Sequence, residues 1–204
     1  LLPRQPAEVP MHRVGDNVLK KISYRENPQG FVAVFEMPGQ SFEWLTPIFA
    51  KPGPWVLVLS GLEKPGNVGA ILRTAEGAGV DAVVIDDPAF DLYNPNVIRA
   101  STGVVFHLPI HCAQPGEILT WLSDHDFRMI AATPEATDLY TQTGYAGAIA
   151  MLLGAEAEGL SDAWLEHAHA AIRIPMAGAA DSLNVSVTAG IIMYEARRQR
   201  DGGV

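Results

Sequence analysis

The amino-acid sequence predicts an α/β domain built around a largely parallel β-sheet, and two observations support this fold class. From Trp55 onward, short runs of apolar residues alternate with helical stretches, and uninterrupted apolar runs are typical of strands that are buried on both faces. In addition, 48% of the 204 residues are hydrophobic, which is enough for one full core and a small second module.

Each element is predicted from its local pattern, with strands at the apolar runs and helices between them. The predicted strands cover residues 55–60, 81–86, 107–112, 127–132, 148–153 and 171–175, and the predicted helices cover residues 68–78, 95–101, 115–123 and 184–199. Ligands of such sheets bind in the loops beyond the carboxyl ends of the strands. This rule directs attention to residues 61–73, 154–161 and 174–186.

The N-terminal part of the chain is predicted to form a separate, smaller piece. Residues 38–54 contain four prolines and two glycines, a composition typical of a domain boundary. Residues 30–35 are predicted to form a strand, although the piece is too short to fold alone. Because the chain does not begin with Met, we expect further residues before Leu1.

The formal net charge of −9 argues against nucleic acid as a partner, because proteins that bind polyanions usually carry a basic excess. Net charge averages over the whole surface, however, so a local basic patch remains compatible with it. The single cysteine, Cys112, excludes an intrachain disulfide and fits a reducing cytoplasm. We expect no membrane span, since no apolar run reaches about 20 residues.

The first two loop segments carry candidate binding groups. Residues 61–73 form a glycine-containing turn that enters a helix, where free backbone N–H groups suit an anion and the planar guanidinium of Arg73 suits a phosphate. The alternative is a plain turn with a solvated arginine. Residues 153–160 place Glu156 and Glu158 between two glycines after a buried strand, so Glu156 can accept hydrogen bonds from a sugar or an amine. The alternative is an ordinary turn with solvated acids.

The third loop segment contains polar side chains at a spacing of two residues, Ser182, Asn184 and Ser186. Small residues precede them and would let a ligand approach the backbone closely. The alternative is that one of these residues only caps the following helix. His107, His111 and Cys112 would lie on different faces of a strand, so we predict no metal site. The arginines between Arg197 and Arg200 either complement the helix dipole or contact RNA.

Taken together, the order and spacing of these segments resemble the SpoU family of RNA methyltransferases, part of the SPOUT superfamily. The resemblance rests on Asn67-Val-Gly-Ala-Ile-Leu-Arg73, on Gly154-Ala-Glu156-Ala-Glu-Gly159, and on Ile174-Pro-Met followed by Ser182-Leu-Asn184-Val-Ser186. It covers about residues 55 to 200, including the stretch from Arg99 to Gly103.

The resemblance implies a fold with a C-terminal deep trefoil knot, a feature that general rules of chain topology would reject. It also implies homodimers and the cofactor S-adenosyl-L-methionine, with no metal. The residues expected to line the cofactor pocket are Thr133, Gly154, Ile174, Met176 and Leu183. Those that match the catalytic positions of the family are Asn67, Arg73, Glu156, Ser182 and Asn184.

The implied activity is methylation of a ribose 2′-hydroxyl in structured RNA. Residues 27–34 resemble the end of the substrate-binding domain of rRNA-methylating members, so we expect residues 1–50 to be the end of that domain with a linker and residues 51–204 to be the methyltransferase domain. This favours 23S-type ribosomal RNA as the substrate. The alternatives are a tRNA substrate, a non-catalytic RNA-binding or ribosome-assembly factor, and an ordinary nucleotide-dependent α/β enzyme. The resemblance favours Arg73 near the hydroxyl, although a free guanidinium stays protonated and is therefore a poor base. Either Arg73 is deprotonated in a special site with assistance from the substrate phosphate, or it orients that phosphate and stabilises the developing oxyanion.

Overall fold

The computed structural model describes residues 9–25, 27–37, 41–86, 90–156 and 158–202, and the chain divides into two units, Leu1–Gly39 and Gln40–Val204. In the smaller unit, Asp16–Ile22 forms helix α1. The strand predicted at residues 30–35 is wrong, because residues 31–37 have no strand pairing. Val34 and Phe35 are 94% and 83% exposed, and an extended segment becomes a strand only when its backbone groups pair with a neighbour.

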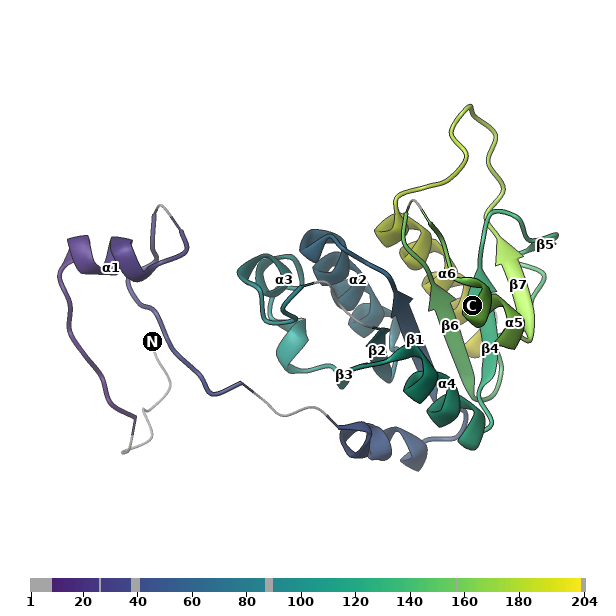
Figure 1. Cartoon of the computed structure of the whole chain (residues 1–204), viewed down its shortest axis with the longest axis horizontal. Helices are drawn as coiled ribbons and strands as arrows, with labels where there is room; N and C mark the ends of the chain where they lie inside the picture. Colours follow the sequence, from purple (N-terminus) through teal and green to yellow (C-terminus); the bar gives the residue numbers. More distant parts are fainter. Residues whose placement is uncertain (1–8, 26, 38–40, 87–89, 157, 203–204) are drawn as a thin grey trace. The chain divides into compact units, whose positions relative to one another are not determined.

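The larger unit is a seven-stranded sheet in the order β3-β2-β1-β6-β4-β7-β5 (Figure 1), and all of its paired strands run parallel. The strands are Trp55–Ser60 (β1), Ala82–Asp86 (β2), Ile110–Ala113 (β3), Arg128–Ala132 (β4), Asp138–Leu139 (β5), Ile149–Leu153 (β6) and Ala170–Arg173 (β7). The helices are Pro65–Ala78 (α2), Pro95–Ala100 (α3), Pro115–Asp124 (α4), Asp162–His167 (α5) and Val185–Arg200 (α6), with 3₁₀ helices at Phe42–Ala50 (η1) and Val104–Phe106 (η2).

Helices cover both faces of the sheet, which explains why its central strands are apolar throughout. Alternate residues of β1 point to opposite faces. Leu57 belongs to the core that includes residues of α2 and α6, whereas Val58 belongs to the core that includes residues of η1, α4 and α5. The predicted α/β class with a parallel sheet flanked by helices is therefore confirmed. Among the described residues, no helix is long and apolar enough to cross a bilayer.

Two predicted elements differ from the structure in ways that have a local cause. The strand predicted from His107 begins only at Ile110, because Gly103 adopts a left-handed φ of +89° and the chain continues as η2, with His107 N donating to Val104 O at 2.9 Å. Residues 41–50, which we expected to be linker, contain η1, whose Leu45 and Ile48 are buried.

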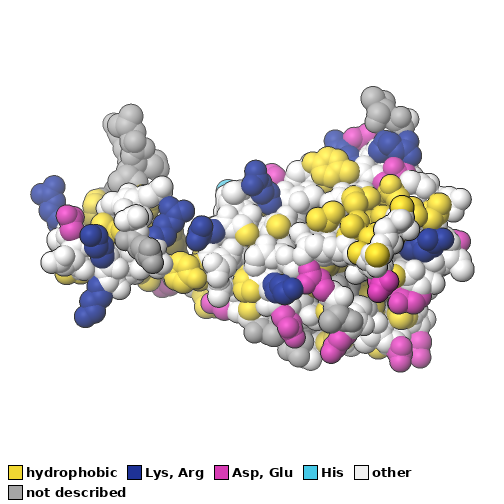
Figure 2. Space-filling model, turned by 90° about the horizontal axis from the view of Figure 1, so that it is seen from above, with side chains coloured by type: hydrophobic (Ala, Val, Ile, Leu, Met, Phe, Trp, Pro, Cys, Tyr) yellow, Lys and Arg dark blue, Asp and Glu magenta, His cyan; other side chains and the backbone are white. Residues whose placement is uncertain are grey.

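The register of the sheet brings four loops to one edge. Leu153 of β6 lies beside Leu59 of β1 and beside Ala132 of β4, and Ala132 lies beside Ile172 of β7. The carboxyl ends of these parallel strands are therefore level, and the loops that follow them meet. Figure 2 looks down on the molecule from above, where hydrophobic side chains gather among Asp, Glu, Lys and Arg on the larger unit.

Candidate functional site

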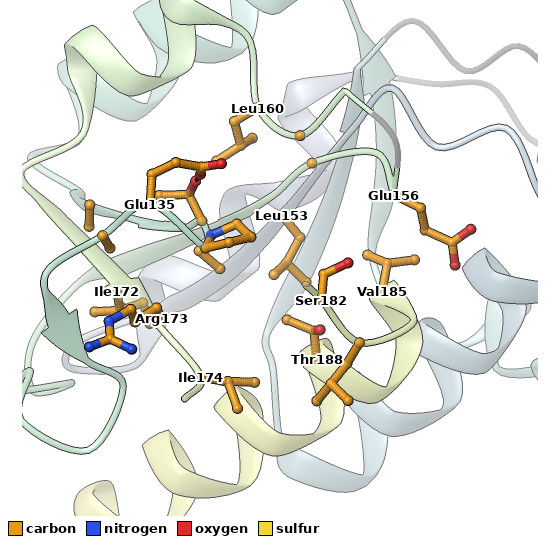
Figure 3. Close-up of a pocket in the computed structure, with 18 of the residues that line it drawn as sticks. Glu135, Leu153, Glu156, Leu160, Ile172, Arg173, Ile174, Ser182, Val185 and Thr188 are labelled. Carbon is orange, nitrogen blue, oxygen red and sulfur yellow. Dashed lines mark hydrogen bonds between the residues drawn. The ribbon is translucent and has the colours of Figure 1, made fainter. Parts of the chain in front are cut away.

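A pocket of about 500 Å³ lies at the edge of the sheet where these loops meet (Figure 3). It is formed by the loops that follow β4, β6 and β7 and by the first turns of α6. The structure brings together in its lining all the residues predicted for the cofactor pocket, namely Thr133, Gly154, Ile174, Met176 and Leu183. Their role in binding a cofactor stays a prediction.

The charged groups of the pocket are mainly carboxylates. Glu135, Glu156, Glu158 and Asp181 line it, with Arg173 as the only Lys or Arg among the described lining residues. The hydroxyl of Thr133 donates a hydrogen bond to Glu135, and this bond lowers the pKa of that carboxyl below its usual value. An excess of ionised carboxylates favours a ligand that carries positive charge.

At one side of the pocket, polar side chains from three distant segments meet on the carboxylate of Glu156. Asn67 Nδ2 donates to Glu156 Oε1 at 3.0 Å, and Asn184 Nδ2 donates to the same oxygen. Lys64 Nζ donates to Glu156 Oε2 at 2.5 Å. The structure thus brings together three of the five predicted catalytic residues.

Lys64 is the member of this cluster that the sequence did not reveal. It is the N-cap residue of α2, and its side chain is largely exposed apart from the ion pair with Glu156. A single lysine in a turn has no distinctive pattern, and 92 residues separate it from its partner. The role of Lys64 becomes visible only in the folded structure, where the loops after β1 and β6 lie close together because these strands are neighbours in the sheet.

The sequence left open whether Asn184 caps a helix or belongs to the site, and in the structure it both caps α6 and contacts Glu156. It is the N-cap residue of α6, and its Oδ1 accepts a hydrogen bond from Ser186 N at 3.0 Å and another from Ser186 Oγ at 2.6 Å. The opposite end of the same amide donates to Glu156. The cap therefore fixes the orientation in which Asn184 presents its NH₂ group to the carboxylate.

The environment of Glu156 favours its ionised form. The hydrogen bond from Lys64 is the largest cause that lowers the pKa of this carboxyl, and the charge of Lys64, the Val185 N–H and Asn67 act in the same direction, whereas burial acts against them. The reciprocal bond raises the pKa of Lys64. Glu156 is therefore a carboxylate at neutral pH, suited to orienting groups and poorly suited to taking a proton.

The loop after β6 has its shape because two glycines bring its backbone together. A Cβ at position 154 would lie 2.2 Å from the carbonyl carbon of Gly159, and Ala155 and Gly159 form a β-bridge. Gly159 itself has a φ of +69°. The glycines thus permit close approach within the loop itself, and the folded loop holds Glu156 between the large pocket and a smaller one of about 140 Å³ that includes Lys64 and Asn67.

The other two predicted catalytic residues lie apart from this cluster. Ser182 is exposed but lines the large pocket. Arg73 is exposed on α2, lines neither pocket, and has no hydrogen-bond partner among the described residues. At 100° per residue, its six-residue separation from Asn67 turns it to a different side of the helix. The single chain does not bring Arg73 to Glu156.

Two further candidates from the sequence, Arg200 and His111, make contacts within the protein. Arg200 donates to the carbonyl oxygens of Tyr145 at 2.8 Å and Gly147 at 3.0 Å, and its guanidinium lies 5.6 Å from the ring centroid of Trp55. These contacts engage the Arg200 guanidinium within the protein, so they favour a role in the fold over a contact with RNA. His111 packs edge-on against Phe42, with centroids 4.2 Å apart, and the described residues contain no cluster of three His, Cys, Asp or Glu that could hold a metal ion.

Comparison with known proteins identifies relatives of the whole larger unit. The SpoU rRNA Methylase family matches residues 54–194. The chain is 34% identical over 194 residues to a 23S rRNA (uridine(2479)-2'-O)-methyltransferase of Streptomyces viridochromogenes. The aligned region covers 87% of this chain and 63% of that protein. The chain thus spans just under two thirds of the length of this relative.

Two solved structures are similar to the chain. A crystal structure of an RNA 2'-O ribose methyltransferase shares 45% sequence identity at a TM-score of 0.73, covering 90% of this chain and 70% of that one. The SpoU methyltransferase AviRb of Streptomyces viridochromogenes, in complex with AdoMet, has a TM-score of 0.85 at 29% identity, covering 94% and 74%. Because the family match extends over well over half of the sequence, this chain belongs to the SpoU rRNA Methylase family.

Proposed function

We propose that this protein uses S-adenosyl-L-methionine to methylate a ribose 2′-hydroxyl in RNA, with 23S-type ribosomal RNA as the substrate. The observation that carries the proposal is the meeting of Asn67, Glu156 and Asn184 beside a pocket lined by the predicted cofactor residues. The names of the relatives support the reaction and the ribosomal substrate. An intact polar cluster also favours an enzyme over a non-catalytic RNA-binding factor.

The residues of the pocket fit this cofactor. A volume of about 500 Å³ is within the range of small-molecule sites, and Leu153, Ile172 and Leu183 provide apolar lining. The carboxylates suit the positive sulfonium and ammonium groups. When bound, the cofactor supplies an electrophilic methyl group.

In the proposed mechanism the protein mainly aligns the two reactants. Glu156, held in place by hydrogen bonds from Lys64, Asn67 and Asn184, orients the acceptor side of the pocket. Arg73 binds the phosphate of the acceptor nucleotide and stabilises negative charge that develops on the 2′-oxygen. Ser182 positions the acceptor and the loop between β7 and α6. The lowered pKa of Glu156 disfavours it as the base. The proton of the 2′-hydroxyl then passes to a phosphate oxygen of the substrate, which the protonated guanidinium of Arg73 holds in position.

The proposal includes the finer features that the family resemblance implies. These are a C-terminal deep trefoil knot, a metal-free site, a homodimer formed through α6, and an N-terminal segment, residues 1–50, that comprises the end of an RNA substrate-binding domain and a linker. Val187 and Tyr194 of α6 support the homodimer, because they are 49% and 55% exposed while Val185 and Ile192 of the same helix are buried.

The proposal is tested by titrating S-adenosyl-L-methionine calorimetrically in excess chelator and by following a labelled methyl group into RNA. We expect binding without metal and label on a ribose of ribosomal RNA, identified by mass spectrometry of nucleosides, and no label in tRNA assayed in parallel. Binding that is lost in chelator and restored by a divalent ion would contradict the metal-free site. Label in tRNA alone would select the alternative substrate.

A further inference from the structure

The larger unit is strongly acidic, so its contacts with RNA depend on few cations. Between residues 40 and 204 the sequence has nine Lys and Arg against nineteen Asp and Glu. Six of the nine donate hydrogen bonds to other protein groups: Lys51, Lys64, Arg128, Arg197, Arg198 and Arg200. Arg73, Arg99 and Arg173 have no such partner among the described residues, which leaves their guanidinium groups available to an external anion.

Two of these free arginines lie on helices that pack tightly together. Arg73 is on α2 and Arg99 is on α3, and both are exposed. Gly69 makes the close approach of the helices possible, because a Cβ at this position would lie 2.6 Å from Ala100 Cβ and 2.7 Å from Val97 O. The helix that carries Asn67 and Arg73 is thus joined directly to the segment that carries Arg99.

The same segment presents an exposed aromatic ring. Phe106 of η2 is 56% exposed and stacks on Tyr93, with ring centroids 5.9 Å apart and an angle of 8° between the planes. The stacking holds the Phe106 ring in a defined orientation while leaving much of it accessible. An oriented, accessible aromatic ring on the same segment as an arginine without a protein partner is a combination with which proteins hold unpaired nucleotides.

A strained turn connects the arginine to the aromatic ring. Thr102, between Arg99 and η2, has a φ of +53°, which is unfavourable for a β-branched residue, and Gly103 follows with a φ of +89°. Hydrogen bonds from Thr102 N to Arg99 O at 3.2 Å and from Gly103 N to Ile98 O at 3.1 Å close the turn. Such strain persists where the surrounding structure fixes the backbone, and it concentrates at ligand-binding sites.

We propose that the α3–η2 surface, defined by Tyr93, Arg99 and Phe106, binds the RNA substrate beside the acceptor nucleotide. Arg99 contacts a backbone phosphate, and the accessible part of the Phe106 ring stacks on an unpaired base. This inference rests on the proposed function and adds a contact surface to it. It assigns the substrate a single-stranded loop or bulge at the modified position, because bases within an A-form helix are not available for stacking.

The aromatic contact is tested by measuring the affinity of the full chain for ribosomal RNA with Phe106→Ala, Phe106→Leu and Phe106→Trp. Loss of one stacked base weakens single-strand binding by roughly one order of magnitude, so we expect about a tenfold higher Kd for the alanine and leucine variants and near-normal binding for tryptophan. Trp44→Ala is the matched control, since Trp44 is a 52% exposed aromatic residue of η1, and it should bind normally. Full affinity of Phe106→Leu would show apolar packing instead of stacking and would overturn the proposal.

The arginine contact has a separate signature in the salt dependence of binding. Removing one phosphate contact lowers the slope of log affinity against log salt by about 0.7 to 0.9. We therefore expect that decrease for Arg99→Gln and none for Phe106→Ala. Arg198→Gln is the control, because Arg198 is bonded to Glu195, and its slope should equal that of the wild type. An unchanged slope for Arg99→Gln would remove this arginine from the surface.

Two parallel measurements separate the failure of this inference from the failure of the proposed function. Cofactor affinity, measured by calorimetry, should stay unchanged in all these variants. If the wild type neither binds nor methylates ribosomal RNA, the proposed function itself fails. If the wild type is active and the Phe106 and Arg99 variants bind RNA as tightly, only the α3–η2 surface is refuted. A change of molecular mass in light scattering would assign Phe106 to a contact between copies of the chain and would equally overturn the proposal.

Discussion

At the scale of single residues, the ion pair between Lys64 and Glu156 stabilises the ionised carboxylate of the site. The ion pair joins the loop after β1 to the loop after β6, and the hydrogen bond from Lys64 is the main reason that the pKa of Glu156 lies below its usual value. A lowered pKa in the folded state contributes stability above the pKa of the unfolded chain, and this contribution is lost as pH falls through the lower, folded value.

We therefore predict that Lys64→Met raises the pKa of Glu156 toward its ordinary value, since both the hydrogen bond and the positive charge disappear. NMR titration of the glutamate carboxyl groups measures this directly. The wild type should keep Glu156 ionised to lower pH than the variant does, and Lys64→Arg should stay close to the wild type. An identical titration of Glu156 in wild type and Lys64→Met would show that the ion pair does not form in solution.

Arg73 provides the second test at this scale, because it lies outside both pockets of the single chain while the proposed mechanism gives it a role toward RNA. We predict that Arg73→Ala leaves cofactor affinity nearly intact and slows methyl transfer by about two to four orders of magnitude. Arg73→Lys should also lose most activity, since a single ammonium does not reproduce the planar fork.

Single-turnover methylation of ribosomal RNA, with a cofactor titration in parallel, measures both effects. Glu76→Ala is the control on the same exposed helix and should change activity little, as is usual for surface substitutions. Near-normal transfer by Arg73→Ala would exclude Arg73 from the mechanism.

Some residues of the site could be predicted from the sequence and others could not. The predicted pocket residues and the Asn67–Glu156–Asn184 contact depend on loops at one edge of a parallel sheet, and the order of the motifs indicates that arrangement. Lys64 was missed because its importance comes from a partner 92 residues away. The six-residue spacing of Asn67 and Arg73 on one helix already implies different directions, but which of the two faces the pocket depends on how α2 packs on the sheet.

At the scale of the elements, the loop after β6 depends on the absence of a side chain at position 154. We predict that Gly154→Ala destabilises the fold by about 1 to 3 kcal/mol, the usual range for overpacking, because the new Cβ would meet the Gly159 backbone at 2.2 Å. It should also weaken cofactor binding, since Gly154 itself lines the pocket. Denaturant unfolding and calorimetry measure the two effects.

Gly116→Ala is the matched control for this substitution and should have the opposite sign. Gly116 lies in the first turn of α4, and a Cβ there meets nothing within 4 Å, so the variant should be about 0.5 to 1 kcal/mol more stable. Equal stability of Gly154→Ala and the wild type would mean that the close approach within the loop is not required.

The elements that could be predicted are those whose own pattern determines them. Strands buried on both faces appear as apolar runs, and the helices between them follow. The prediction was wrong for residues 30–35, where an apolar run lacks a pairing partner among the described residues. It missed η1, although Leu45 and Ile48 are three residues apart, the period of a 3₁₀ helix, because Pro47 suggested a linker.

At the scale of the whole molecule, net charge was a poor guide to the partner. A charge of −9 argues against nucleic acid, yet the family relationship supports RNA. The reason is the distribution of the charges, because most cations of the larger unit are bonded internally and a few arginines remain free. Knotting and association are also properties of the whole chain, which local patterns do not specify.

We predict a homodimer in which α6 contributes the contact, because Val187 and Tyr194 leave apolar surface exposed on a helix whose other side is buried. Light scattering across micromolar concentrations should give the mass of two chains. Val187→Asp should lower the mass toward that of one chain, while Trp44→Asp, at an exposed residue of η1, should leave it unchanged. A monomer at all concentrations would refute the dimer.

The most direct test of the central claim is a map of 2′-O-methyl groups in total RNA from cells that contain the gene, lack it, or carry it with Asn184→Ala. We predict that one ribose of 23S-type ribosomal RNA loses its methyl group in the cells without the gene. The modification should stay absent or strongly reduced with the variant, since Asn184 joins the acceptor cluster to the start of α6. Identical 2′-O-methyl maps in all three strains, or a difference confined to methyl groups on bases, would contradict the proposed function.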